Sequence, residues 1–189
     1  ARLFFYEFDA PVLASDVMVH VAPVNHASGV YVLPHFMRGA INCLLEQPKL
    51  DLFAETVRRV GGTRTLMVPT MLRRLVSSSA AEDMNLPTLR HVVYTSAPMD
   101  EYLLRECTGR FGQIFEQVYG FAEYGVVSIL PIADHPSDPK GPWPRYASST
   151  GRPIAGTKLS LRDPGGVPVA PGEPGEVCVK GPGLFSGYW

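Results

Sequence analysis

Residues 117–123 read Gln-Val-Tyr-Gly-Phe-Ala-Glu and stand where the pattern of the chain changes. Up to residue 120, short β-rich apolar runs alternate with amphipathic segments of helical period. The runs lack a clean polar alternation, which is typical of parallel strands buried on both faces. This order favours an α/β fold with a mostly parallel sheet flanked by helices.

Individual elements follow from apolar spacing and from the residues that start or stop helices. The expected strands cover residues 17–22, 41–45, 65–68, 91–95 and 114–119. The first expected helix is capped by Asn25 and runs to about Arg38, and the second runs from Asp51 to Gly61. A third lies around residues 72–76 and ends at the serines 77–79, and a fourth covers 99–110. Residues 1–9 are interrupted by charges and are interpreted as the end of a helix, not a signal peptide.

A different composition begins after residue 130. Residues 131–153 are rich in Pro, Gly, Asp and Ser, and two alternating runs follow at 158–162 and 176–180 with a Pro-Gly-Gly turn at 164–166. This pattern predicts an antiparallel hairpin or part of a small barrel. We therefore expect an α/β subdomain over residues 1–145 and an incomplete β-rich subdomain over 146–189.

Composition excludes several classes of protein. The chain has 189 residues, 46% hydrophobic and 19% charged, with a net charge of −1. The chain has no excess of basic residues that would indicate nucleic acid or an anionic membrane as a partner. No apolar run reaches the ~20 residues that a membrane span needs. Three separated cysteines favour neither a disulfide framework nor a zinc site. A cytoplasmic location is the expectation that follows.

Several catalytic signatures are missing from the sequence. It contains no GxGxxG after a strand, no GxxxxGK[ST], no GxSxG and no HExxH. An oxidoreductase on a doubly wound sheet therefore loses its main support.

Three segments instead follow the ends of expected strands, where ligands bind in doubly wound sheets. They are residues 23–26 (Pro-Val-Asn-His), 95–98 (Thr-Ser-Ala-Pro) and 117–123. Small residues allow close approach of a ligand to the backbone, Tyr119 offers an aromatic face, and Glu123 is a hard oxygen ligand suited to Mg²⁺. Each segment alone is equally typical of an ordinary strand-to-helix turn or of a solvated carboxylate.

The order and spacing of the segments resemble the AMP-binding, acyl-adenylate-forming superfamily, which includes acyl-CoA synthetases, aryl-CoA ligases and luciferases. Residues 23–26 resemble its P-x-x-H segment, 95–99 its G-G-A-P-L loop, and 117–123 its Q-G-Y-G-x-T-E loop. Residues 149–153 (Ser-Thr-Gly-Arg-Pro) resemble G-S-x-G-R-P. Residues 174–181, with the later Gly-Tyr at 187–188, resemble P-G-E-[IV]-x-[IV]-x-G…G-Y. The resemblance covers nearly the whole chain.

The resemblance implies an ATP-dependent, AMP-forming acid–thiol ligase. A fatty or aryl carboxylic acid would attack ATP to give an acyl-adenylate, which coenzyme A would then accept. The implied catalytic residues are Glu123 and His26. Glu123 would hold Mg²⁺, and His26 would lie at the entrance for the acyl group. The implied nucleotide-binding residues are Ser96, Ala97, Pro98, Gln117, Tyr119, Gly120, Phe121 and Ala122. Val30, Phe36 and Phe121 would line the acyl pocket or pack in the core.

The sequence departs from the family pattern in ways that bear on activity. Ala122 replaces a Thr that donates a hydrogen bond to phosphate, and Thr95-Ser96 replaces Gly-Gly. The family's phosphate loop and its ribose-binding Asp are not found in these 189 residues. We therefore expect an internal fragment of the large N-terminal domain, inactive by itself. Ala122 keeps open a second hypothesis, a non-catalytic nucleotide-binding or interaction domain. The acid, the thiol acceptor and the oligomeric state are not readable.

Overall fold

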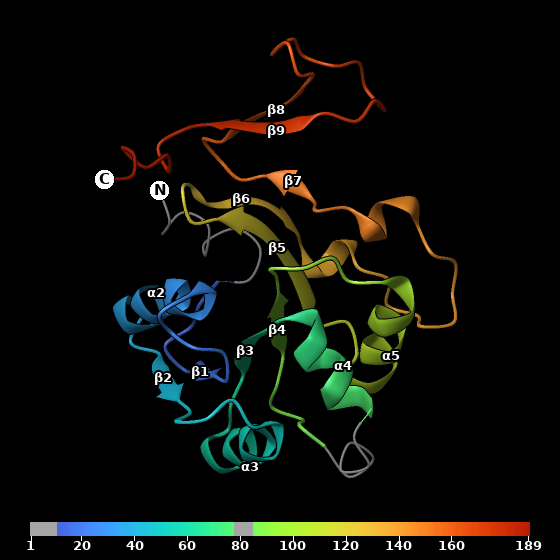
Figure 1. Ribbon diagram of the computed structural model, residues 1–189. Coiled ribbons are helices and arrows are strands. Elements are labelled where there is room, and N and C mark those ends of the chain that lie inside the picture. The colour runs from blue at the N-terminus through green and yellow to red at the C-terminus, as the bar shows by residue number, and fades with distance from the viewer. Residues whose placement is uncertain (1–10, 78–84) are drawn as a thin grey trace.

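A computed structural model describes residues 11–77 and 85–189, so the expected helix end at residues 1–9 and most of the exit at 77–79 lie outside the described part. The described residues form a main sheet in the order β2-β1-β3-β4-β5-β6-β7 and a two-stranded sheet, β8-β9 (Figure 1). Strands β1 to β5 pair in parallel, and β6 and β7 are antiparallel. The α/β class is confirmed.

The strands are short and are joined mostly by helices. Their bounds are β1 (Val17–His20), β2 (Ile41–Leu44), β3 (Arg64–Met67), β4 (His91–Tyr94), β5 (Phe115–Phe121), β6 (Gly125–Leu130), β7 (Arg152–Pro153), β8 (Lys158–Arg162) and β9 (Glu176–Lys180). The α-helices are α2 (Val32–Met37), α3 (Leu50–Val60), α4 (Pro69–Ser77) and α5 (Glu101–Phe111). The 3₁₀ helices are η1 (Ala27–Tyr31), η3 (Ile132–Asp134) and η4 (Arg145–Ser148).

Local signals explain where two of the longer helices begin and end. Helix α5 starts after Asp100, whose side chain accepts a hydrogen bond from the backbone N–H of Leu103 at 2.9 Å, an N-cap contact. Helix α3 ends at Gly61, whose φ of 66° is the left-handed conformation that glycine adopts without strain. Phe53 and Val57 of α3 are buried four residues apart on one face.

The helix expected from Asn25 to Arg38 is corrected by the structure. The segment begins at Ala27 as the 3₁₀ helix η1 and becomes α-helical only at α2. A Cβ on Gly29 would lie 1.9 Å from the backbone oxygen of Val24, so the chain folds back tightly before η1. Pro34 has no N–H to donate to the preceding turn, which limits helical hydrogen bonding there.

Two apolar cores lie on the two faces of the parallel sheet. The larger one packs the buried faces of α3, α4 and α5 against strand residues such as Val19 and Tyr94. The smaller one contains Tyr31 of η1, Leu66 of β3 and Val118 of β5. Odd and even positions of each strand therefore face different cores, and this explains the absence of polar alternation in their sequences.

A buried ionic network lies at the amino ends of the strands, away from the ends where ligands bind in such sheets. Arg64 Nε donates to Asp16 Oδ2 at 2.9 Å, and Arg90 Nη2 donates to Asp16 Oδ1 at 2.7 Å. Arg64 and Asp16 are 3% and 1% exposed, and Thr63 also donates to Asp16. Because each buried charge has a partner, this network fastens the segment before β1 to β3.

Strands β6 and β7 were not expected from the sequence. After a turn at residues 122–124 the chain reverses and β6 pairs with β5, with a bulge between Tyr119 and Gly120. Strand β7 then pairs with β6. It follows Gly151, where a Cβ would lie 1.7 Å from the backbone oxygen of Ile129 and where φ is 82°. Only glycine fits at that position.

The expected hairpin is present as β8 and β9, which pair from Lys158–Lys180 to Arg162–Glu176. It lies beyond β7, at the top of the view in Figure 1, and most of its residues are exposed. Strand β7 belongs to the main sheet although it follows residue 145, and the subdomain division at that residue stays a prediction. In residues 11–77 and 85–189, no helix has the length and apolar character needed to cross a membrane.

Candidate active-site cleft

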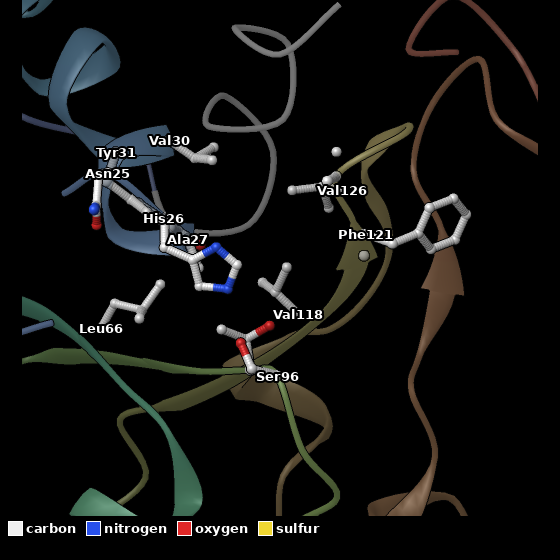
Figure 2. Close-up of a pocket in the computed structure, with 14 residues that line it drawn as sticks. Asn25, His26, Ala27, Val30, Tyr31, Leu66, Ser96, Val118, Phe121 and Val126 are labelled. Carbon is white, nitrogen blue, oxygen red and sulfur yellow. The ribbon is translucent and has the colours of Figure 1, made fainter. Parts of the chain in front are cut away.

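An open cleft of about 280 Å³ lies where several strands of the main sheet end (Figure 2). Its walls come from the segment after β1, from β3, from the end of β4, and from the β5–β6 hairpin. The lining residues are Asn25, His26, Ala27, Val30, Tyr31, Leu66, Thr95, Ser96, Val118, Gly120, Phe121, Ala122, Gly125 and Val126. Segments far apart in sequence thus meet at the edge of the sheet where ligands bind in doubly wound folds.

The interior of the cleft is apolar. Tyr31, Leu66 and Val118 belong to the smaller core, and Val30 and Val126 pack against it. The cleft is therefore the open end of that core, so a ligand group entering it would meet aliphatic and aromatic surface. Such a surface stabilises an apolar group by removing it from water.

His26 carries the imidazole of this lining. The imidazole projects from the segment before η1 toward the middle of the cleft, above Ser96 in the view (Figure 2). Backbone hydrogen bonds hold this segment in place: the His26 N–H donates to Pro23 O at 3.3 Å, and the His26 backbone oxygen accepts from the Gly29 N–H at 3.0 Å. His26 is thus placed to contact the polar end of a group whose apolar part fills the cleft.

A buried chain of polar contacts anchors the His26 segment to the sheet. His20 Nδ1 and the Ser28 hydroxyl are 2.8 Å apart, and His20 Nε2 lies 2.8 Å from Asn42 Oδ1. Burial lowers the pKa of His20, and the hydrogen bond to Asn42 partly opposes this shift. Ser28 is fully buried, so it cannot act as a nucleophile toward a substrate. The contacts hold η1 against β1 and β2.

The segment after β4 contains an unusual backbone conformation. Ser96 has a φ of 72° and is the one non-glycine residue with positive φ in the described ranges 11–77 and 85–189. The left-handed conformation turns the chain sharply out of β4 and brings Ser96 to the cleft. Glycine is the residue that adopts this conformation without strain. Ala97 and Pro98 are exposed beyond the turn and do not line the cleft.

Strand β5 presents different residues on its two faces. Val118 faces the cleft with Gly120. The rings of Tyr119 and Phe121 contact each other at a centroid distance of 6.2 Å, and Phe121 also contacts Tyr124 at 6.4 Å. The Phe121 ring is turned away from His26 in the view, although Phe121 borders the cleft (Figure 2). The strand therefore separates an apolar cleft from an aromatic surface that includes Tyr119.

Glu123 lies at the tip of the β5–β6 turn and outside the cleft lining. Its Oε1 accepts a hydrogen bond from the Tyr188 hydroxyl at 2.5 Å, and its backbone oxygen accepts from the Phe185 N–H at 2.8 Å. The Tyr188 hydrogen bond holds the pKa of the Glu123 carboxyl below its usual value. Glu123 is therefore an ionised, half-buried carboxylate at neutral pH, in the turn that follows the strand carrying Tyr119.

The residues expected from the sequence divide into two groups. The cleft brings together His26, Ser96, Gly120, Phe121 and Ala122. Ala97, Pro98, Gln117, Tyr119 and Glu123 stand outside its lining, on the segments 95–98 and 117–123. Val30 lines the cleft, as expected for an acyl pocket. Phe36 does not line it and is 73% exposed on α2.

Leu66, Gly125 and Val126 are among the lining residues that the sequence did not predict. Leu66 lies within β3 and looks like any buried strand residue, so no local signal marks it. Gly125 and Val126 belong to β6, and the run Gly-Val-Val-Ser-Ile-Leu at 125–130 is a β-rich signal that could have revealed it.

The carboxylate of Glu123 fits a hard cation held together with phosphates. Among the described residues, no cluster of three or more His, Cys, Asp or Glu side chains could hold a metal ion by protein ligands alone. Mg²⁺ is commonly bound by one or two carboxylates plus substrate phosphates. A half-buried, ionised Glu123 matches that arrangement.

Comparison with known proteins gives the same picture over nearly the whole chain. The family model described as AMP-binding enzyme matches residues 2–189. The chain is 34% identical over 171 residues to a medium/long-chain-fatty-acid–CoA ligase of Mycobacterium tuberculosis, covering 88% of this chain and 28% of the relative. It is 32% identical over 176 residues to a fatty acid–[acyl-carrier-protein] ligase of Streptomyces coeruleorubidus, covering 92% and 33%. The chain thus spans about a third of the length of these relatives.

A solved structure supports the fold. The amide bond synthetase of Marinactinospora thermotolerans superposes with a TM-score of 0.85 at 25% identity, covering 99% of this chain and 36% of that one. The fold, the order of the strand-end segments and the family match agree. The chain therefore belongs to the AMP-binding enzyme family, the family of the adenylate-forming ligases.

Proposed function

We propose that the whole protein is an ATP-dependent, AMP-forming ligase that activates an apolar carboxylic acid, fatty or aryl, and transfers it to coenzyme A. The observation that carries the proposal is the meeting of His26, Ser96 and the 120–122 segment at the end of β5 around an apolar cleft in a member of this family. The relatives named as fatty-acid ligases support the substrate class. A role in fatty acid metabolism and a cytoplasmic location are further parts of the proposal.

The cleft and the outer face of β5 receive different parts of the reactants. The acyl chain fills the cleft against Val30, Leu66 and Val118, with the carboxylate near His26. The adenine lies against Tyr119 and the segment of Ser96, Ala97 and Pro98. The substrate carboxylate oxygen then attacks the α-phosphorus of ATP, and pyrophosphate leaves. This division places the reacting atoms at the carboxyl ends of β4 and β5, where both parts of the site meet.

The side chains position groups and balance charge, because the substrates supply both nucleophile and leaving group. Glu123 holds Mg²⁺, which neutralises charge on the phosphates when it is bound. The imidazole of His26 borders the carboxylate and excludes water from that end of the cleft. In the second step the thiol sulfur of coenzyme A attacks the acyl carbonyl carbon and AMP leaves.

A non-hydrolysable decanoyl-adenylate analogue tests this assignment. Calorimetric titration of the protein should show that the analogue binds more tightly than ATP or decanoate alone. Val126→Asp, which puts a charge in the cleft, should remove the acyl contribution and keep ATP binding. Val167→Asp, at a residue 59% exposed in the β8–β9 turn, is the control. Equal affinities of the analogue and ATP would refute an acyl site in the cleft.

One observation favours a second function. Ala122 has no hydroxyl to donate to phosphate, which fits a domain that binds nucleotide without catalysis. Tight ATP binding without AMP production by the full-length protein, across a panel of carboxylic acids, would support this alternative. For the 189 residues alone we predict no ATP–pyrophosphate exchange above a Glu123→Ala control, and exchange above that level would refute this prediction.

A further inference from the structure

The turn that carries Glu123 is docked against a segment more than fifty residues away. The backbone N–H of Phe185 donates to Glu123 O at 2.8 Å. Gly181 and Gly183 allow close contact with Tyr124, the residue after Glu123. A Cβ on Gly181 would lie 2.1 Å from the Tyr124 hydroxyl, and a Cβ on Gly183 would lie 2.6 Å from the Tyr124 backbone oxygen. The Tyr124 side chain is buried, and its hydroxyl lies 2.8 Å from Thr157 Oγ1. The 181–188 segment thus fixes the backbone of the turn.

Tyr188 extends this docking to the carboxylate itself. Its hydroxyl donates to Glu123 Oε1 at 2.5 Å. The Phe185 and Tyr188 rings pack edge to face with centroids 4.9 Å apart, which limits the positions open to the phenol. Tyr188 is 77% exposed, so this contact contributes little to the apolar core. What it fixes is the direction of one carboxylate oxygen.

We infer that Tyr188 is a positioning residue for Glu123, orienting the carboxylate that takes Mg²⁺ with the phosphates of ATP; this rests on the function proposed above. A carboxylate has two oxygens with about four acceptor positions, so a hydrogen bond to Oε1 leaves capacity for a cation. A free glutamate side chain would have to lose rotamer freedom when the cation binds. The Tyr188 contact removes part of that freedom beforehand and so strengthens binding.

A double-mutant cycle on the 189-residue protein tests the inference. Tyr188→Phe keeps the ring and removes only the hydroxyl. Calorimetric titrations would use ATP with Mg²⁺ and ATP with EDTA. We expect Tyr188→Phe to weaken binding of MgATP by about three- to tenfold, the net range of an ordinary hydrogen bond, and to leave binding of metal-free ATP unchanged. In a Glu123→Gln background the same substitution should have no effect.

Tyr146→Phe is the matched control, because Tyr146 is also largely exposed but lies on η4, away from the turn. Equal weakening of MgATP and metal-free ATP by Tyr188→Phe would mean that the hydroxyl only stabilises the loop, and would overturn the inference. Unchanged MgATP binding would overturn it as well. If the wild-type protein binds ATP no better with Mg²⁺ than without, the proposed role of Glu123 fails first and the inference falls with it.

Discussion

The backbone oxygen of Gly125 lies 2.1 Å from the point that a Cβ on Gly120 would occupy. Gly120 pairs with Val126, the neighbour of Gly125, across the β5–β6 hairpin, next to the bulge at Tyr119 and Gly120. This close approach of two backbones brings both strands to the cleft wall. A side chain at residue 120 would force the strands apart where the nucleotide loop begins.

Gly120→Ala should therefore lower the free energy of unfolding by about 1–3 kcal/mol, the usual range for overpacking, and weaken ATP binding. Urea unfolding measures the change. Gly109→Ala in helix α5 is the control, because a Cβ there would lie at an ordinary contact distance of 3.5 Å from Pro139 Cγ. Alanine there should raise stability by about 0.5–1 kcal/mol. Equal effects of the two substitutions would contradict the close approach.

Ser96→Gly should raise the melting temperature. Left-handed backbone costs a non-glycine residue about 1–2 kcal/mol, and the greater freedom of glycine in the unfolded chain offsets about 0.5–1 kcal/mol of the relief. The net gain is up to about 1.5 kcal/mol. Ser96→Ala removes the hydroxyl but keeps the strained φ of 72°, so it should give no gain. A melting temperature raised equally by alanine would show that the backbone at residue 96 is not the cause.

His35 should make stability depend on pH. The side chain is fully buried, and burial lowers its pKa from the usual 6.5 to about 4, although a hydrogen bond to Tyr31 O at 2.7 Å raises it. Below about pH 6.5 the unfolded chain binds a proton that the folded chain does not. Stability should thus fall as the pH drops from about 6.5 to 4, by up to about 3 kcal/mol from this residue.

His35→Gln isolates that contribution, since the amide can still donate to Tyr31 O but does not titrate. Burial also lowers the pKa of His20 and of His135, so the variant should keep part of the pH dependence. Urea unfolding at several pH values should give a shallower loss for the variant than for the wild type. Parallel curves would show that His35 is not protonated on unfolding in this range.

Ala122→Thr should strengthen binding of MgATP by about tenfold, because a hydrogen bond from a hydroxyl to a charged phosphate contributes about 1.5 kcal/mol. Residue 122 is exposed at the cleft edge, so the added group has room. Ala122→Val has the same shape without the hydroxyl and should not strengthen binding. Similar affinities for the two variants, measured by calorimetry, would contradict a phosphate contact at this position.

Sequence patterns predicted the parallel part of the sheet because each strand there is a separate apolar run between helices. They did not predict β6. Only three residues separate it from β5, whereas the alternation of strands with helices suggested that a helix would follow β5. Strand β7 has two residues, and its pairing depends on the glycine at 151 approaching Ile129. Such a contact is a property of the folded chain and not of local composition.

The candidate site was predictable to the extent that it lies on strand ends. Topology alone brings His26, Ser96 and Ala122 to one edge of the sheet. Alternation along β5 puts Val118 and Gly120 on one face and Tyr119 on the other, but which face lines the cleft could not be read from residue order. The contact of Tyr188 with Glu123 joins residues 65 positions apart through an irregular segment, for which sequence period gives no information.

Photolabelling with 2-azido-ATP, followed by peptide mapping, tests most directly the claim that the nucleotide lies on the strand-end segments. The account predicts labelling within residues 95–98 and 117–122, abolished by excess ATP, since the adenine is placed between Tyr119 and the segment of Ser96, Ala97 and Pro98. Labelling confined to the β8–β9 hairpin or to α3, or labelling that excess ATP does not reduce, would contradict it.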